Sequence, residues 1–155
     1  MKPFLQIVTL IFLVSGCATK TYLPGKSLSK DYGRVTVIRE YAEPTVFNIY
    51  VFLDGTKAAS ISNRSYAAFS VPVGEHLLKF DWPKTASSTE FETKIDITEY
   101  SEHYFYVSQD IELSNFSFLG AAVIGYVSYN VSEKLYVAKI TSKQAKEILS
   151  QIKKK

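Results

Sequence analysis

The chain has 155 residues with a formal net charge of +3, and 46% of the residues are hydrophobic. This is the length of one domain, with enough apolar residues for a core of its own. The small net charge and the lack of a long basic face in the sequence argue against nucleic acid as a partner. The 11 Tyr and 10 Phe residues favour β-strands, so we expect a mainly-β protein.

Residues 1–16 have the order of a secretory signal peptide. Lys2 precedes an apolar run over residues 4–14, and small residues then lead to a cysteine. The run has about half of the roughly 20 apolar residues that a helix needs to cross a bilayer. We therefore expect the signal to be removed, by cleavage between Gly16 and Cys17.

Cys17 is the only cysteine of the chain, so no disulfide can form within it. Residues 13–17, which read LVSGC, resemble the lipobox of bacterial lipoproteins, with Val14 where Leu is commoner. The resemblance implies a diacylglycerol and an N-acyl lipid such as palmitate on Cys17, and no other cofactor. Several acyl chains together anchor a protein stably, whereas one chain binds weakly. The alternative is a buried core cysteine behind an ordinary signal, for which the small and polar neighbours are unsuited.

The residue after Cys17 is Ala18 and not Asp. By resemblance to sorting in Gram-negative bacteria, this favours lipid anchoring in the outer membrane, with the protein facing the periplasm. Residues 17–33 are polar and contain Pro24 and Gly25, which predicts a lipidated tether. Residues 34–155 then form the predicted domain, an antiparallel β-sandwich of the immunoglobulin or prealbumin type with a C-terminal helix.

Alternating apolar and polar residues predict the strands of this sandwich. In the clearest of them, Ile49, Val51 and Leu53 share the face toward the core. Asp54-Gly55 follows directly and is typical of a tight hairpin turn. Residues 72–75 predict a type II turn in which Gly74 takes a positive φ. The predicted strands are residues 35–38, 46–53, 57–61, 66–71, 76–82, 90–97, 103–108 and 134–140.

Two further segments lie toward the C-terminus. Residues 116–131 are apolar but too short to span a bilayer, so we expect a buried strand or a close-packed turn, with contact to lipid or a partner as the alternative. Thr141 and Gln144 fit a capping box at the start of a helix. Lys residues at 153–155 suit the negative end of its dipole, which we prefer to membrane or nucleic-acid binding. The apolar side chains at helical spacing are Ala145, Ile148, Leu149 and Ile152.

The order of strand, Asp54-Gly55 turn, strand, Tyr66 and the segment 71–77, which reads VPVGEHL, is similar to a family of bacterial lipoproteins known only as a domain of unknown function. That family is itself similar to the PEGA and carboxypeptidase-regulatory-like β-sandwich modules. The similarity covers residues 34–82, and the acidic and proline residues typical of PEGA modules are not found after Ile61. It implies a sandwich fold and a place in the cell envelope, and it implies no substrate.

Few residues of the chain suit catalysis or metal binding. His76 and His103 begin two predicted strands, but a zinc site takes three or four ligands and no His-x-x-x-His or second cysteine supplies the rest, so no metal site is expected. No Gly-x-Ser-x-Gly, phosphate-binding glycine loop or nucleotide fingerprint is present. The sequence therefore favours a protein that is not an enzyme.

Two functions remain open. The favoured one is a noncatalytic binding or structural module that the lipid holds at the membrane and that engages an envelope protein or polymer. Its possible binding surface consists of aromatic side chains that point outward from predicted strands. These are Tyr50, Tyr66, Tyr104 and Tyr106. The alternative is a small envelope hydrolase or carbohydrate-active enzyme, which would depend on His76 and His103.

Overall fold

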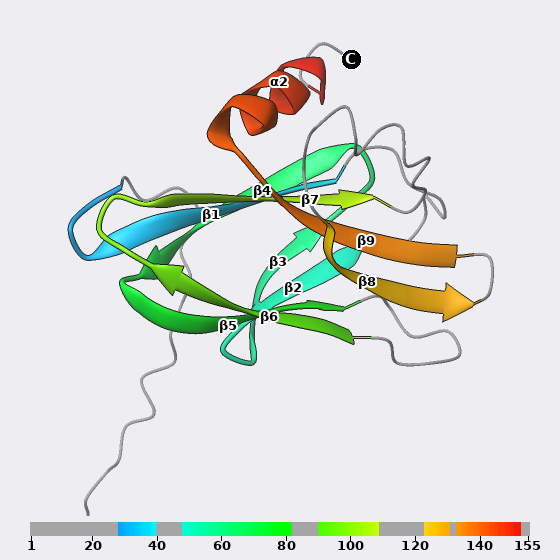
Figure 1. Cartoon of the computed structure of the whole chain (residues 1–155), viewed down its shortest axis with the longest axis horizontal. Helices are drawn as coiled ribbons and strands as arrows, with labels where there is room; N and C mark the ends of the chain where they lie inside the picture. Colours follow the sequence, from blue (N-terminus) through cyan, green and yellow to red (C-terminus); the bar gives the residue numbers. More distant parts are fainter. Residues whose placement is uncertain (1–27, 40–47, 82–89, 109–122, 131–132, 153–155) are drawn as a thin grey trace, which may run out of the picture.

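A computed structural model of the chain describes residues 28–39, 48–81, 90–108, 123–130 and 133–152. The described part is made of strands and one helix (Figure 1). The strands are β1 (Tyr32–Arg39), β2 (Ile49–Leu53), β3 (Thr56–Ile61), β4 (Ser65–Pro72), β5 (Gly74–Asp81), β6 (Glu90–Ile97), β7 (Glu102–Ser108), β8 (Val123–Asn130) and β9 (Glu133–Ile140), and the helix is α2 (Ser142–Ile152).

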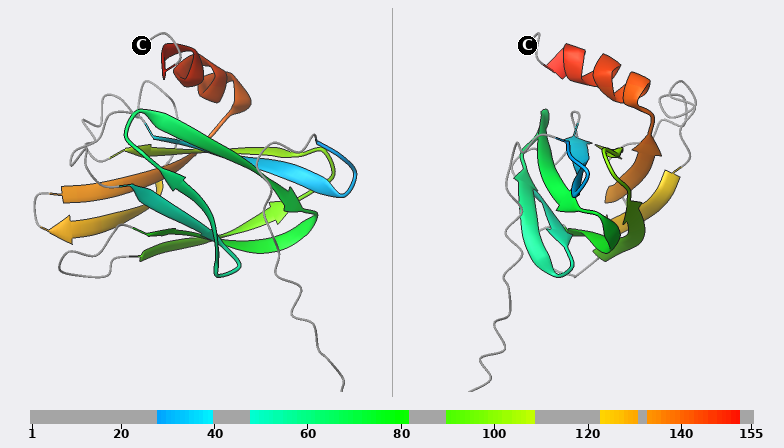
Figure 2. Two further views of the ribbon diagram at one scale, coloured as in Figure 1. Left: turned by 180° about the vertical axis from the view of Figure 1, so that it is seen from behind. Right: turned by 90° about the vertical axis from the view of Figure 1, so that its left-hand side faces the viewer.

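The strands form two sheets that pack face to face, as the end view in Figure 2 shows. One sheet has the order β4-β1-β7-β9-β8 and the other has the order β3-β2-β5-β6. The predicted mainly-β sandwich with a C-terminal helix is therefore confirmed. The pairing is antiparallel as predicted, except that β1 and β7 run parallel.

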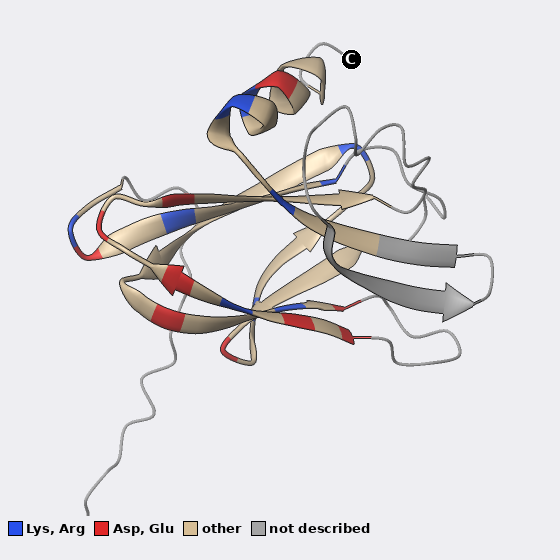
Figure 3. Cartoon of the chain, in the orientation of Figure 1, with Lys and Arg blue, Asp and Glu red and all other residues tan. Residues whose placement is uncertain are grey.

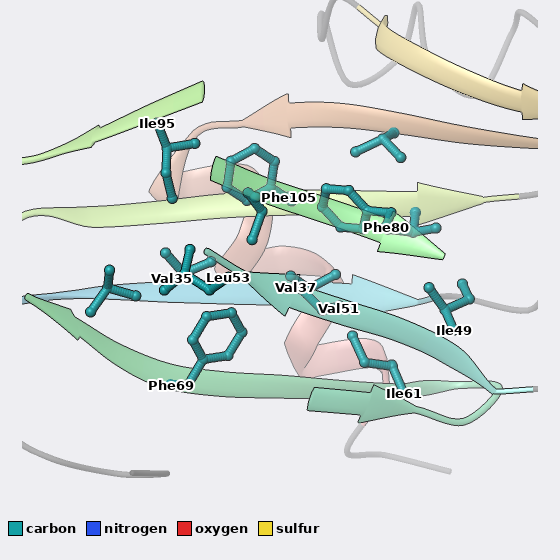
Figure 4. Packing of buried hydrophobic residues seen from close by; sticks show 14 of the residues in the cluster. Val35, Val37, Ile49, Val51, Leu53, Ile61, Phe69, Phe80, Ile95 and Phe105 are labelled. Carbon is teal, nitrogen blue, oxygen red and sulfur yellow. The ribbon is translucent and has the colours of Figure 1, made fainter. Parts of the chain in front are cut away.

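The core lies between the inner faces of the two sheets (Figure 4). Ile49, Val51 and Leu53 of β2 are fully buried there, because alternate side chains of a strand point to the same face. Burying each such side chain contributes about 1.5–3 kcal/mol to folding. Arg39, at the end of β1, is fully buried as well, and its guanidinium donates to the carbonyl of Ile61 on the opposite sheet at 3.2 Å.

The hairpin turn between β2 and β3 has the predicted form. Asp54 and Gly55 have φ values of 49° and 77°, the left-handed conformation that two-residue hairpin loops require at both positions. The predicted type II turn at residues 72–75 is wrong. Gly74 has a positive φ, but of 132°, and only Val73 separates β4 from β5, which belong to different sheets. The chain crosses between the sheets here because β5 pairs with β2 and β6 and not with β4.

Helix α2 covers the outer face of the five-stranded sheet, as Figure 2 shows. Its buried side chains, Ala145 and Ile148, pack in a second apolar cluster on this face. The predicted capping box is present: the backbone N–H of Thr141 donates to Gln144 Oε1 at 2.7 Å, and the backbone N–H of Gln144 donates to Thr141 Oγ1 at 3.4 Å. The helix is therefore fixed at its start and along one side.

The packed domain begins earlier than the predicted boundary at residue 34. β1 starts at Tyr32, and the preceding turn is bonded to a loop far along the chain, because the backbone N–H of Tyr100 donates to the carbonyl of Ser29 at 3.1 Å. These main-chain bonds leave no pattern in the side chains, so the sequence suggested a tether up to residue 33. Residues 17–27 of the predicted tether lie outside the described residues.

Several predictions fall partly or wholly outside the described residues. β8 confirms a strand within the segment 116–131, of which residues 116–122 and 131 are not described. Residues 1–16, Cys17, Trp82 and the segment 153–155 also lie outside. Within the described part of the chain, no helix has the length and apolar character needed to cross a bilayer.

Candidate functional site

The four tyrosines predicted as a binding surface do not lie together. Tyr50 is on β2 in the four-stranded sheet, and the other three are on β4 and β7 in the five-stranded sheet. Tyr66 is 41% exposed, and it lies on β4 opposite Ile38 of β1. It therefore projects from the outer face of the five-stranded sheet, which it shares with the cluster under α2.

Tyr104 and Tyr106 are not on the surface, which corrects their prediction as binding residues. They are 7% and 5% exposed and pack in the cluster that contains Ala145 and Ile148 of α2. The hydroxyl of Tyr104 donates to Glu102 Oε2 at 2.9 Å, and burial is the first cause that raises the pKa of Tyr104. The strand pattern indicated two aromatic faces on β7, but it did not show that a helix covers one of them.

Tyr50 and Phe52 lie side by side in sequence alternation on the outer face of the four-stranded sheet, and both are half-buried. Lys57 of β3 places its ammonium nitrogen 3.9 Å from the centre of the Tyr50 ring, and Lys79 of β5 lies 5.7 Å from the centre of the Phe52 ring. Such cation–π contacts contribute about 0.5–1 kcal/mol each at exposed sites. We call these four residues, Tyr50, Phe52, Lys57 and Lys79, the Tyr50 face.

Carboxylates surround the Tyr50 face on β5 and β6 (Figure 3). Lys79 Nζ lies 2.7 Å from Glu90 Oε2, and its hydrogen bond to Glu90 is the first cause that raises the pKa of Lys79. Asp81 is opposite Tyr50, and Glu92 is opposite Lys79. The face thus presents two aromatic rings, two cations and several carboxylates, which suits contacts with a polar partner that carries hydrogen-bonding groups. Alternation identified Tyr50 here, whereas the lysines that cover the rings come from strand pairing.

His76 is buried and bonded at both ring nitrogens. Nδ1 lies 2.7 Å from Asp54 Oδ2, and Nε2 lies 2.8 Å from the carbonyl oxygen of Pro72. Because a carbonyl oxygen only accepts, Nε2 is the donor in the second bond. Asp54 also accepts from the backbone N–H of Leu77 through Oδ1 at 3.0 Å. The histidine therefore ties the hairpin turn to β5 and to the crossing at Pro72, and neither nitrogen is available as a general base.

His103 lies in the other sheet, on β7, and is half-buried. Burial is the first cause that lowers the pKa of His103, the charge of Lys139 is the second, and Asp96 acts in the opposite sense. Its Nδ1 atom is buried and has no hydrogen-bond partner among the described residues. The described residues contain no group of three or more His, Cys, Asp or Glu side chains arranged to hold a metal ion.

Comparisons with protein-family models, with curated proteins and with solved structures give no match to this chain. The functional argument therefore depends on its own residues.

Proposed function

We propose that the chain is a bacterial lipoprotein in which lipid on Cys17 holds a noncatalytic β-sandwich at the outer membrane, facing the periplasm. The observation that carries the proposal is the order of charged start, short apolar run, small residues and single cysteine over residues 1–17. The domain follows closely, since packed residues begin by position 28. This arrangement suits a module that acts at the membrane surface.

The contacts of His76 support a role in binding or structure over the hydrolase alternative. Its ring is engaged by Asp54 and Pro72, so an enzyme that depended on it would have to break the contacts that hold the turn. The Tyr50 face is the part of the predicted binding surface that combines aromatic rings with charge. We propose that this face engages an envelope protein or polymer.

Membrane attachment is tested by fractionation of cells that produce the full chain. The wild-type protein should sediment with outer membranes and require detergent for release. A Cys17→Ser variant has nearly the same shape at this position but lacks the thiol, so it should be found without lipid and outside the outer-membrane fraction. A variant that still floats with outer membranes and carries acyl groups would refute the role of Cys17.

The binding surface is tested by a photo-crosslinking phenylalanine analogue placed at Tyr50 in intact cells. The matched control carries the same analogue at Lys146, which is exposed on α2 over the opposite sheet. A partner that binds the Tyr50 face should give an adduct from position 50 and a much weaker one from position 146. Equal adducts from the two positions, or an adduct from position 146 alone, would contradict the assignment of this face.

A further inference from the structure

Three segments meet at the end of the sandwich where the chain enters the domain, at the left of Figure 1. The backbone N–H of Val73 donates to the carbonyl of Asp31 at 3.0 Å, and the backbone N–H of Tyr100 donates to the carbonyl of Ser29 at 3.1 Å. The entering turn is therefore bonded to both the link between the sheets and the turn between β6 and β7. We call this region, residues 28–31, 73 and 98–101, the tether end.

The tether end carries two of the four large hydrophobic side chains that are exposed in the described part of the chain. Tyr100 is 59% exposed and Val73 is 44% exposed. The others, Tyr66 and Leu77, project from the faces of the two sheets. Exposed apolar side chains gathered at one end mark a candidate contact surface.

The backbone at Tyr100 gives independent support. The residue is third in a turn closed by a hydrogen bond from the N–H of Ser101 to the carbonyl of Thr98 at 3.1 Å, and its φ is 55°. Glycine or asparagine suits this position, whereas a bulky residue with a positive φ is strained. The fold thus holds an aromatic ring toward solvent where its own stability favours glycine. Such strain points to a function for the side chain.

The length of chain before the domain limits what this end can meet. Residues 17–27 separate Cys17 from the first described residue, and even fully extended they span no more than about 40 Å. Tyr66 lies at the opposite end of β4 from Pro72, about 20 Å farther along the strand. A lipid on Cys17 therefore keeps the tether end close to the bilayer whatever the path of the intervening residues.

We propose that the tether end contacts the phospholipid surface directly, with Tyr100 and Val73 entering the headgroup region. This inference rests on the proposed lipid anchor. Tyrosine is enriched at membrane interfaces because its ring is apolar and its hydroxyl is polar. The exposed charges at this end are of both signs, Lys30 beside Asp31 and Glu99. The contact is therefore apolar in origin, and it persists at high salt, where attraction between exposed charges is screened.

The test uses the lipidated protein purified from envelopes and reconstituted in vesicles of phosphatidylethanolamine and phosphatidylglycerol with brominated acyl chains. Trp82 is replaced by Phe, and a single tryptophan is introduced as Tyr100→Trp or, in the matched control, as Tyr66→Trp. Bromine quenches only nearby tryptophan. We expect at least a twofold greater loss of fluorescence at position 100 than at position 66, unchanged by added salt.

A second variant separates contact from folding. Tyr100→Gly relieves the strained φ, so its melting temperature should be equal to or higher than that of the wild type. In the same vesicles it should nevertheless reduce the quenching of a Val73→Trp probe. Equal quenching at positions 100 and 66 in vesicle-bound protein would overturn the contact and leave the anchor standing. Protein that carries no lipid and does not float with vesicles would overturn both.

Discussion

Gly33 shows how closely the entering chain approaches the rest of the domain. A Cβ atom at this position would lie 2.6 Å from Ile97 Cγ2 and 2.9 Å from the carbonyl oxygen of Ser101. Gly33→Ala should therefore lower the free energy of unfolding by about 1–3 kcal/mol, the usual cost of overpacking. Denaturation in urea measures this loss. An Ala variant as stable as the wild type would show that the approach of β1 to Ser101 is wrong.

The pair of Asp54 and His76 predicts a second loss of stability. His76→Phe keeps an aromatic ring of similar size but removes both hydrogen bonds, and should cost about 1–3 kcal/mol in the free energy of unfolding. Asp54→Asn is the matched control, because asparagine keeps an acceptor for the N–H of Leu77 and tolerates a positive φ. It should cost less than His76→Phe. The reverse order, measured in urea, would contradict the role given to the histidine.

His103 predicts a pH dependence of stability. Burial and then Lys139 lower its pKa in the folded protein, so the unfolded chain binds a proton there at a pH where the folded chain resists it. The stability that the neutral ring contributes is complete above about pH 6.5, the ordinary pKa of histidine, and is lost as the pH falls through the lowered folded value. His103→Gln should therefore lose less stability than the wild type between about pH 7.5 and pH 5.

Chemical denaturation at several pH values measures this difference. Lys139→Ala is an internal control, since it removes the second cause of the lowered pKa and should reduce the acid loss only in part. A wild type and a His103→Gln variant with parallel pH profiles would contradict the account.

At the scale of the elements, α2 is a structural cover and not an appendage. Ile148 is 6% exposed against Tyr104 and Tyr106, so Ile148→Ala should cost about 2–5 kcal/mol. Lys146→Ala, on the exposed side of the same helix, should stay within about 0.5 kcal/mol of the wild type. Thermal unfolding followed by circular dichroism distinguishes the two. Similar losses for both variants would show that α2 does not pack as described.

The elements that could be predicted from the sequence are those with local causes. Alternation placed the buried face of β2, the dipeptide Asp54-Gly55 gave its hairpin turn, and helical spacing gave α2 with its capping box. The partners of the strands could not be predicted in this way. β4 and β5 are almost continuous in sequence but join different sheets, and β1 pairs with the distant β7, because pairing depends on the assembled core.

The same limit applies to the candidate site. Tyr50 was found from its outward position on a strand, whereas the lysine over its ring belongs to the neighbouring strand and follows from register. Tyr104 and Tyr106 have the same outward pattern but are covered by α2. Alternation states which side chains share a face, and only the tertiary structure states whether that face meets water.

For the whole molecule, the account describes a sandwich held at the membrane by its entering end, with the Tyr50 face directed elsewhere for binding. Both parts depend on Cys17, which lies outside the described residues and was identified from residues 13–17 alone. The anchor sets the location, and the location gives the exposed Tyr100 and Val73 their proposed partner.

Mass spectrometry of the N-terminal peptide, from protein isolated out of washed envelopes, tests this account most directly. We predict a chain that begins at Cys17 and carries a diacylglycerol together with an N-linked acyl chain. A mature chain that begins elsewhere, or a Cys17 terminus with no lipid, would contradict it.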